Sequence, residues 1–429
     1  MTDVLSIECG WTDPIGSPEE IAQTAALIDI RLGDRHITRA ENDFSKTVTD
    51  RVPLSAYPLV LWFAESWWRL RWECSPAHTP PLDWRMSHEL AAAGAGFVWP
   101  PVVLESDGES IRLSMRPAPP SQVEPLRYLE YRQGWTSGDD FERSVGGFID
   151  LACARLTDRG LSNTQLHLVW AEVLSERADI GRSRFRQIEA MLGFDPGGTP
   201  DALVNRFLEL SNRAGMNASN EIAHAAAGER PEQVLDAIIK SAGDVGALGR
   251  FQLPQRPTNG FLGHATPWER GYKMAREIRA ECALGQVLED RALAELLGLQ
   301  QGVLVGDGMP STAPAGIAIP GTQGVRFIFR RPRRLARRFE AARLLSDYLL
   351  APDSDTWFLE TDAHTSRQKS QRAFAAELLC PIEALQEYLQ GELSDSKVEN
   401  AAEHFQVSDY IVRRQLVNNQ VPGYGSISL

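Results

Sequence analysis

Cysteine is scarce in this sequence, and its distribution shows no sign of a metal or disulfide framework. Five cysteines occur among 429 residues, and no two of them form a C-x-x-C pair. Scattered cysteines in odd number argue against a structural zinc site and against a set of disulfide bonds. We therefore expect reduced thiols in a protein of the cytoplasm.

Long apolar runs and phosphate-binding loops are also missing. The best apolar stretch, residues 54–70, is interrupted by Glu65 and Arg69, whereas a membrane-spanning helix needs about 18 apolar residues. The first residues contain no basic segment followed by an apolar one, so no signal peptide is expected. No P-loop and no G-x-G-x-x-G motif is present. These absences predict a cytoplasmic protein with no membrane partner and no cofactor.

Basic residues are outnumbered, since 44 lysines and arginines face 57 aspartates and glutamates, for a net charge of −13. This balance argues against non-specific nucleic-acid binding by the whole surface, although it leaves room for a local basic patch. The length predicts two or three domains. A composition of 43% hydrophobic residues is that of an ordinary soluble protein with a large core.

The first part of the chain, residues 1–130, is rich in tryptophan and predicts a mixed α/β domain of unknown role. Apolar positions spaced by about 3.6 residues predict a helix over 54–72. Two strands are expected over 97–104 and 110–115, joined by a Ser-Asp-Gly turn at 106–108. The tryptophans are explained either by core packing or by an aromatic ligand cleft.

The rest of the chain divides into a helical middle, residues 131–260, and a final domain over 261–429. Glycines and prolines between 244 and 263 predict a linker near that boundary. The final domain alternates strands and helices, which makes the predicted fold class α+β. Its expected strands and helices span 315–319, 325–329, 332–350, 357–359 and 366–379.

Three blocks of the final domain resemble the ImmA/IrrE-type zinc metallopeptidases. Residues 338–352 read RFEAARLLSDYLLAP, which is similar to the family's active-site helix R-F-x-x-A-H-E-L-G-H-x-L-L-x-P. Residues 373–381 read AFAAELLCP, and residues 401–408 read AAEHFQVS; both resemble later blocks of the family in the same order. The resemblance covers roughly residues 265–420 and implies a small zincin-like domain.

The departures from the family pattern fall on its metal site. In H-E-x-x-H, two histidines on one helix face bind zinc, and the glutamate is the general base. The corresponding residues here are Arg343, Leu344 and Asp347, and the third ligand position falls at Ser370. Arginine has no lone pair to offer a metal, and leucine cannot move a proton. The resemblance therefore implies a degenerate member without metal or catalytic residues, not an enzyme.

Arg343 and Asp347 stand four residues apart on the expected helix. One hypothesis is that their ion pair fills the vacated metal site, with the guanidinium where the cation stood. The alternative is an ordinary pair on the helix surface. The first hypothesis also expects Ser370 close by on the next helix.

A basic cluster covers Arg326–Arg343, and Glu340 is its one acidic residue. Such a local reversal of charge can contact nucleic-acid phosphates or an acidic partner. The alternative is a solvated helix face paired with acidic neighbours of the same protein. The candidate anion-binding residues are Arg330, Arg331, Arg333, Arg334, Arg337 and Arg338.

These observations leave three hypotheses of function. The first is a non-catalytic pseudo-metallopeptidase that binds a protein or peptide, within the bacterial regulatory or phage-defence systems that the resemblance suggests. The second is a nucleic-acid-binding regulator or complex subunit that uses the cluster Arg326–Arg343. The third is a zinc peptidase whose ligands have moved elsewhere in the chain.

Overall fold

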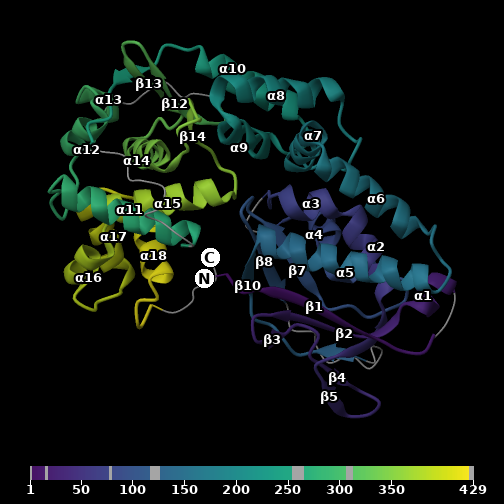
Figure 1. The fold of residues 1–429 in the computed structure, drawn as a ribbon. Helices are drawn as coiled ribbons and strands as arrows, with labels where there is room; N and C mark the ends of the chain where they lie inside the picture. The colour runs from purple at the N-terminus through teal and green to yellow at the C-terminus, as the bar shows by residue number, and fades with distance from the viewer. Residues whose placement is uncertain are drawn as a thin grey trace. The chain divides into compact units, whose positions relative to one another are not determined.

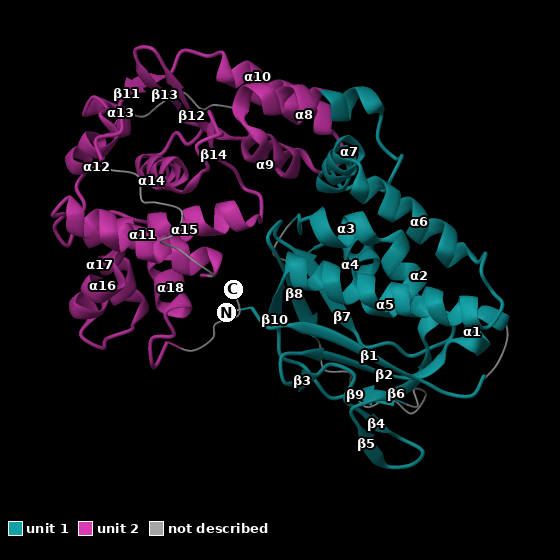
Figure 2. Cartoon of the chain, in the orientation of Figure 1, with its two compact units in different colours: residues 1–205 teal, residues 206–429 magenta. Residues whose placement is uncertain are grey.

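The chain folds as a mixed α+β protein, as predicted. The computed structural model describes residues 2–14, 18–76, 80–115, 126–253, 265–305 and 313–424. They form two compact units, residues 1–205 and 206–429 (Figure 2). The sequence predicted boundaries near 130 and 260 instead. Most of the predicted linker, residues 254–263, lies outside the described residues.

The first unit contains three antiparallel sheets (Figure 1). The largest pairs the long strands β1 and β2 along their whole length, and β3 and β6 also pair with β2. The predicted hairpin is present as β7 and β8, where the carboxylate of Asp107 accepts from the backbone N–H of Ser110 at 2.8 Å. The strands span Leu5–Trp11 (β1), Ala25–Leu32 (β2), Arg35–His36 (β3), Ala40–Asn42 (β4), Thr47–Thr49 (β5), Val52–Ser55 (β6), Val102–Ser106 (β7), Ser110–Met115 (β8), Leu126–Tyr128 (β9) and Gly134–Ser137 (β10).

Helices of the first unit pack on these sheets. Ser137 caps the longest one by accepting from the backbone N–H of Asp140 at 3.0 Å, a role that serine often takes at a helix N-terminus. The single helix predicted over 54–72 is in fact two, because the backbone leaves helical geometry at Ser66. The helices span Glu19–Gln23 (α1), Ala56–Glu65 (α2), Trp67–Trp72 (α3), Leu82–Ser87 (α4), Gly138–Asp158 (α5), Gln165–Ala178 (α6) and Ile180–Met191 (α7), with a 3₁₀ turn at Leu90–Ala93.

Tryptophan packing explains why the first unit extends beyond residue 130. Trp67 and Trp68 are buried in the same core as Phe141 of α5 and Trp170 of α6, and the rings of Trp67 and Trp170 meet edge to face at 5.0 Å. Large aromatic side chains dominate the energetics of such cores. The helices α5 to α7 of the predicted middle domain therefore belong with the N-terminal sheets.

The second unit surrounds a four-stranded antiparallel sheet in the order β11-β13-β12-β14. Most of its elements lie within a residue or two of the ranges expected from the sequence, and the helix predicted over 366–379 has those bounds. They span Asp201–Ala214 (α8, across the unit boundary), Met216–Ala226 (α9), Pro231–Ala242 (α10), Ala247–Gly249 (β11), Pro267–Glu281 (α11), Asp290–Leu297 (α12), Gly302–Val305 (α13), Gly316–Gly321 (β12), Gly324–Ile328 (β13), Arg334–Leu350 (α14), Phe358–Glu360 (β14), Ser366–Leu379 (α15), Ile382–Leu389 (α16), Asp395–Phe405 (α17) and Asp409–Asn418 (α18).

Two helices of the second unit, α11 and α15, approach each other very closely. A Cβ atom added to Gly271 of α11 would lie 2.3 Å from the carbonyl oxygen of Ser370 on α15. Only glycine fits there without a shift of the backbone. On its other side α15 packs against α14, and Leu344 and Phe374 are fully buried in the shared core. The close packing positions the polar side chains of α15 against α14.

Among the described residues, no helix is both long enough and apolar enough to cross a membrane.

Candidate functional site

The residues that the family resemblance singled out on α14 lie inside the protein. Arg343 is 4% exposed and Asp347 is 1% exposed, and Leu344 between them is fully buried. A buried charge is costly unless it is paired and hydrogen-bonded. The partners of Arg343 and Asp347 therefore decide how these two buried charges are stabilised.

Arg343 pairs with residues beyond its own helix. Its guanidinium donates to the carboxylate of Glu360 at the end of β14, to the side-chain oxygen of Gln368 on α15, and to the backbone carbonyl of Thr361 at 2.6 Å. Burial lowers the pKa of the Arg343 guanidinium, and the charge of Glu360 opposes that shift.

Asp347 is satisfied by a separate set of donors. It accepts from Arg367 at 2.7 and 2.6 Å, from Gln371 at 2.7 Å and from the backbone N–H of Leu359 at 2.7 Å. Both hypotheses of an ion pair between Arg343 and Asp347 are therefore wrong. Such a pair neither fills a metal site nor lies on the helix surface, because β14 and α15 supply a better partner for each charge.

Ser370, at the predicted third ligand position, takes no part in this network. It is buried on α15, and its carbonyl oxygen lies against Gly271 of α11. The α15 side chains that reach the α14 charges are Arg367, Gln368 and Gln371. Sequence reasoning missed them; the only signal was a run of polar residues on a helix flanked by apolar ones.

The Glu360 carboxylate is shared by two arginines. Arg330, 8% exposed, donates to Glu360 at 2.6 and 2.9 Å and to Asp362 at 2.8 Å. Burial raises the pKa of Glu360, but Arg343 and Arg330 together bring that pKa below its usual value. The sequence did not predict Glu360 as a site residue either, because it stands on a different element from every residue of the expected site.

Most of the predicted basic cluster is engaged within the protein. Arg338 is fully buried and pairs with Asp290, which also binds Arg334 at 2.6 Å. Arg337 is buried and donates to backbone carbonyls, including that of Val303 at 3.0 Å. Most arginines of the cluster thus make contacts inside the protein and do not form a solvated helix face.

Two arginines of the cluster remain nearer to solvent. Arg331 pairs with Asp362 at 2.8 Å, and its side chain is 40% exposed. Arg333 is exposed, and within the described part of the chain its side chain has no hydrogen bond or ion pair. Among the residues that the structure describes, Arg333 is therefore the one candidate nucleic-acid contact without a side-chain partner.

A pocket of about 980 Å³ lies beside Arg343. Its floor includes Arg343, Glu340 and Glu360. One wall comes from the first turns of α14, and the other comes from the turn between α17 and α18. The apolar side chains of the walls are Leu335, Ala336, Phe339, Ala402, Val407 and Ile411.

Glu340 is an acid of the pocket floor whose pKa is strongly shifted. It accepts from the backbone N–H groups of Arg330 at 2.8 Å and Arg331 at 3.0 Å. Burial, reinforced by the negative charge of Glu360, raises the pKa of Glu340 to about 7. A carboxyl group that titrates near neutrality marks this floor as a candidate site.

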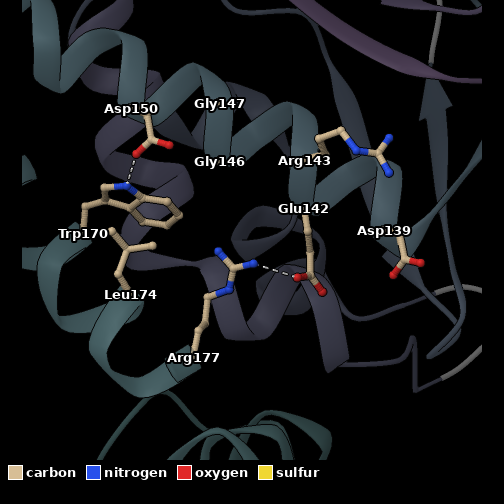
Figure 3. A pocket seen from close by; sticks show the side chains of 9 residues that line it. All are labelled: Asp139, Glu142, Arg143, Gly146, Gly147, Asp150, Trp170, Leu174 and Arg177. Carbon is tan, nitrogen blue, oxygen red and sulfur yellow. Dashed lines mark hydrogen bonds and ion pairs between the residues drawn. The ribbon is translucent and has the colours of Figure 1, made fainter. Parts of the chain in front are cut away.

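A smaller groove of about 440 Å³ lies in the first unit between α5 and α6 (Figure 3). Gly146 and Gly147 form its base, Arg177 points toward Glu142 at 3.1 Å, and the Trp170 ring donates to Asp150 at 2.7 Å. These polar groups already satisfy one another. The groove therefore has a weaker claim to a ligand than the pocket of the second unit.

No three His, Cys, Asp or Glu side chains among the described residues are grouped so that they can hold a metal ion. His88, whose sequence His-Glu-Leu-Ala-Ala starts like a metal motif, is fully buried and stacks on Trp84 at 3.7 Å. The site is therefore characterised by its own residues: a buried network of arginines and carboxylates beneath an apolar pocket.

When the sequence is compared with models of known protein families and with curated proteins, it matches none of them.

Proposed function

We propose that the chain is a non-catalytic pseudo-metallopeptidase that acts by binding a protein or peptide segment in the pocket of its second unit. The observation that carries the proposal is the combination of a large, largely apolar pocket with a floor of buried, mutually paired charges. A role in a bacterial regulatory or phage-defence system follows from the sequence resemblance and belongs to the same proposal.

The residues at the metal-ligand positions support a role without metal catalysis. Arg343 offers no lone pair, and all its contacts are with carboxylate or carbonyl oxygens. Asp347 already accepts four hydrogen bonds. A zinc-activated water would also need a general base, whereas Leu344 stands at that position.

The size and lining of the pocket support binding. Ligand pockets are typically about 300–1,000 Å³ and combine apolar walls with a few placed polar groups. The present pocket lies at the upper end of that range. It also opens directly over the place where the resemblance puts the active-site cleft, next to Arg343.

Selection of peptides tests the proposal. The purified full chain is screened against a random peptide library, and affinities of the selected peptides are measured for Ala336→Trp and Ala280→Trp variants. Ala336 lines the pocket, whereas Ala280 is exposed on α11 outside it. We expect selected peptides that lose binding only with Ala336→Trp. Failure to select any peptide, or equal binding by both variants, would contradict the proposal.

A further inference from the structure

We infer that the pocket takes an apolar group that ends in a hydrogen-bond acceptor, either a carbonyl or a carboxylate, and that this acceptor receives the Nε–H of Arg343. The inference rests on the proposed function, because it names the ligand chemistry of the same pocket. The inference concerns which atoms of the pocket floor contact the ligand, whereas the proposed function concerns the class of molecule that binds.

The unmatched atom of the floor is a donor. Arg343 is 4% exposed, and both its terminal nitrogens donate to Glu360, Thr361 and Gln368. Its Nε atom is buried and has no hydrogen-bond partner among the residues that the structure describes. Nearly all buried polar groups in proteins have a partner, so an unpaired donor on a residue that lines a pocket indicates a missing acceptor.

The acceptors of the floor already have donors. Glu360 receives hydrogen bonds from Arg330 and Arg343, and Glu340 receives the backbone N–H groups of Arg330 and Arg331. A ligand ammonium beside Arg343 would face the Arg343 cation, whereas the exposed carboxylates of the lining, Glu403 and Asp409, belong to the opposite wall. A carbonyl or carboxylate oxygen matches what the floor lacks.

The walls define the rest of the ligand. Phe339 on α14 and Val407 and Ile411 on the opposite wall present apolar surface above Arg343. Burial of apolar surface supplies the affinity, and the single acceptor supplies the orientation. A peptide segment has both parts, since an apolar side chain lies beside a backbone carbonyl or a terminal carboxylate.

Three small probes with one apolar body test the inference: 4-phenylbutyrate, 4-phenylbutanamide and 4-phenylbutylamine. Binding to the full chain is measured by calorimetry. We expect the acid and the amide to bind, and the amine to bind at least about tenfold more weakly, which is the effect of about 1.4 kcal/mol. The affinity of the acid relative to the amide tells whether a carboxylate or a carbonyl is preferred. Binding should be lost with Ala336→Trp and retained with Ala280→Trp.

Nitrogen-15 NMR of the arginine Nε–H groups gives a second, direct measurement. The Arg343 resonance, assigned by its absence in Arg343→Lys, should shift when the acid or the amide is added. Equal binding of the amine, or probe binding without a shift of this resonance, would overturn the inference. Selected peptides that still depended on the pocket would then leave the proposed function intact. Conversely, bound probes without any selected peptide would defeat the proposed function alone.

Discussion

Arg343 donates to Glu360 of β14, although Asp347 stands one turn away on the same helix. At a helix surface, residues four apart are each other's nearest partners. In this interior the two charges take different partners, because Arg367 reaches Asp347 from α15 while Glu360 reaches Arg343 from the sheet. The two residues thus belong to two adjacent buried ion pairs.

The pair between Arg343 and Glu360 should matter for stability. Replacing Arg343 with Ala removes the described donor to the carbonyl of Thr361 and leaves Arg330 as the hydrogen-bonded cation of Glu360 among the described residues. We expect a loss of about 3–5 kcal/mol in the free energy of unfolding of the second unit. The control is Arg206→Ala, which removes a solvent-exposed pair with Asp236 and should cost less than about 1 kcal/mol.

Hydrogen exchange of α14 and α15 during denaturant titration measures this loss within the second unit. A loss below about 1 kcal/mol for Arg343→Ala would show that the buried network is not stabilising. A comparable loss in the Arg206→Ala control would show that the measurement does not isolate the buried pair.

Zinc content is the simplest check on the proposed absence of metal. The positions that the resemblance assigns to zinc ligands hold Arg343, Asp347 and Ser370, and Asp347 already accepts hydrogen bonds from Arg367 and Gln371. We expect the purified protein to contain far less than one zinc per chain by elemental analysis. About one zinc per chain, lost when residues of this pocket are replaced, would favour a peptidase with relocated ligands.

The arginine cluster should bind nucleic acid weakly at most. Arg330 and Arg338 are buried in ion pairs, so their charges are not available to phosphates. We expect duplex DNA to bind poorly even at low salt, with no change for Arg333→Ala. Tight, salt-dependent binding that this substitution weakened would revive the nucleic-acid hypothesis. A variant with alanine at positions 330, 331, 333 and 334 together would be unsuitable as a test of nucleic-acid binding, because it also breaks internal ion pairs.

Two glycines in helices should respond oppositely to alanine. A Cβ at Gly271 would lie 2.3 Å from the Ser370 carbonyl, whereas a Cβ at Gly147 would meet nothing within 4 Å. We expect Gly271→Ala to destabilise the second unit by about 1–3 kcal/mol through overpacking. Gly147→Ala should stabilise the first unit by about 0.5–1 kcal/mol, since alanine favours helix interiors. Thermal unfolding with hydrogen exchange distinguishes the two units. A change in stability of the same sign for both substitutions would refute this expectation.

Glu73 and His88 give the first unit opposing pH dependences. Burial raises the pKa of Glu73 to about 7 and lowers the pKa of His88 to about 3. As pH falls from about 7 to 4.5, the folded state takes up the Glu73 proton first and gains stability. As pH falls from about 6.5 to 3, the unfolded state takes up the His88 proton first, and stability is lost.

Replacing Glu73 with Gln should therefore expose the effect of His88. We expect the Glu73→Gln variant to lose stability more steeply than the unmodified protein between pH 6.5 and 4.5. Denaturant unfolding followed by tryptophan fluorescence reports mainly on this unit, because nine of the 11 tryptophans lie within it and only Trp268 and Trp357 lie in the second unit. Parallel pH profiles for the two proteins would contradict the opposition of the two groups.

Local elements were predictable because their signals lie within a few residues of the chain. The turn at 106–108 and the helix 366–379 follow from turn and periodicity rules, and the structure confirms them. The break at Ser66 was missed because the apolar spacing continues through it. A boundary between units depends on which surfaces pack together, and no local signal reports that.

The sequence by itself determined that arginine, leucine, aspartate and serine stand where the resembled family has its ligands and base, since residue identity alone decides what can hold zinc. Only the tertiary structure decided what those residues do instead. Glu360, Arg367 and Gln371 reach Arg343 and Asp347 from elements separated in the chain by loops whose course no periodicity predicts. The pocket is likewise assembled from α14 and the α17–α18 turn, about 70 residues apart, because hydrophobic packing is set by three-dimensional fit and not by sequence separation.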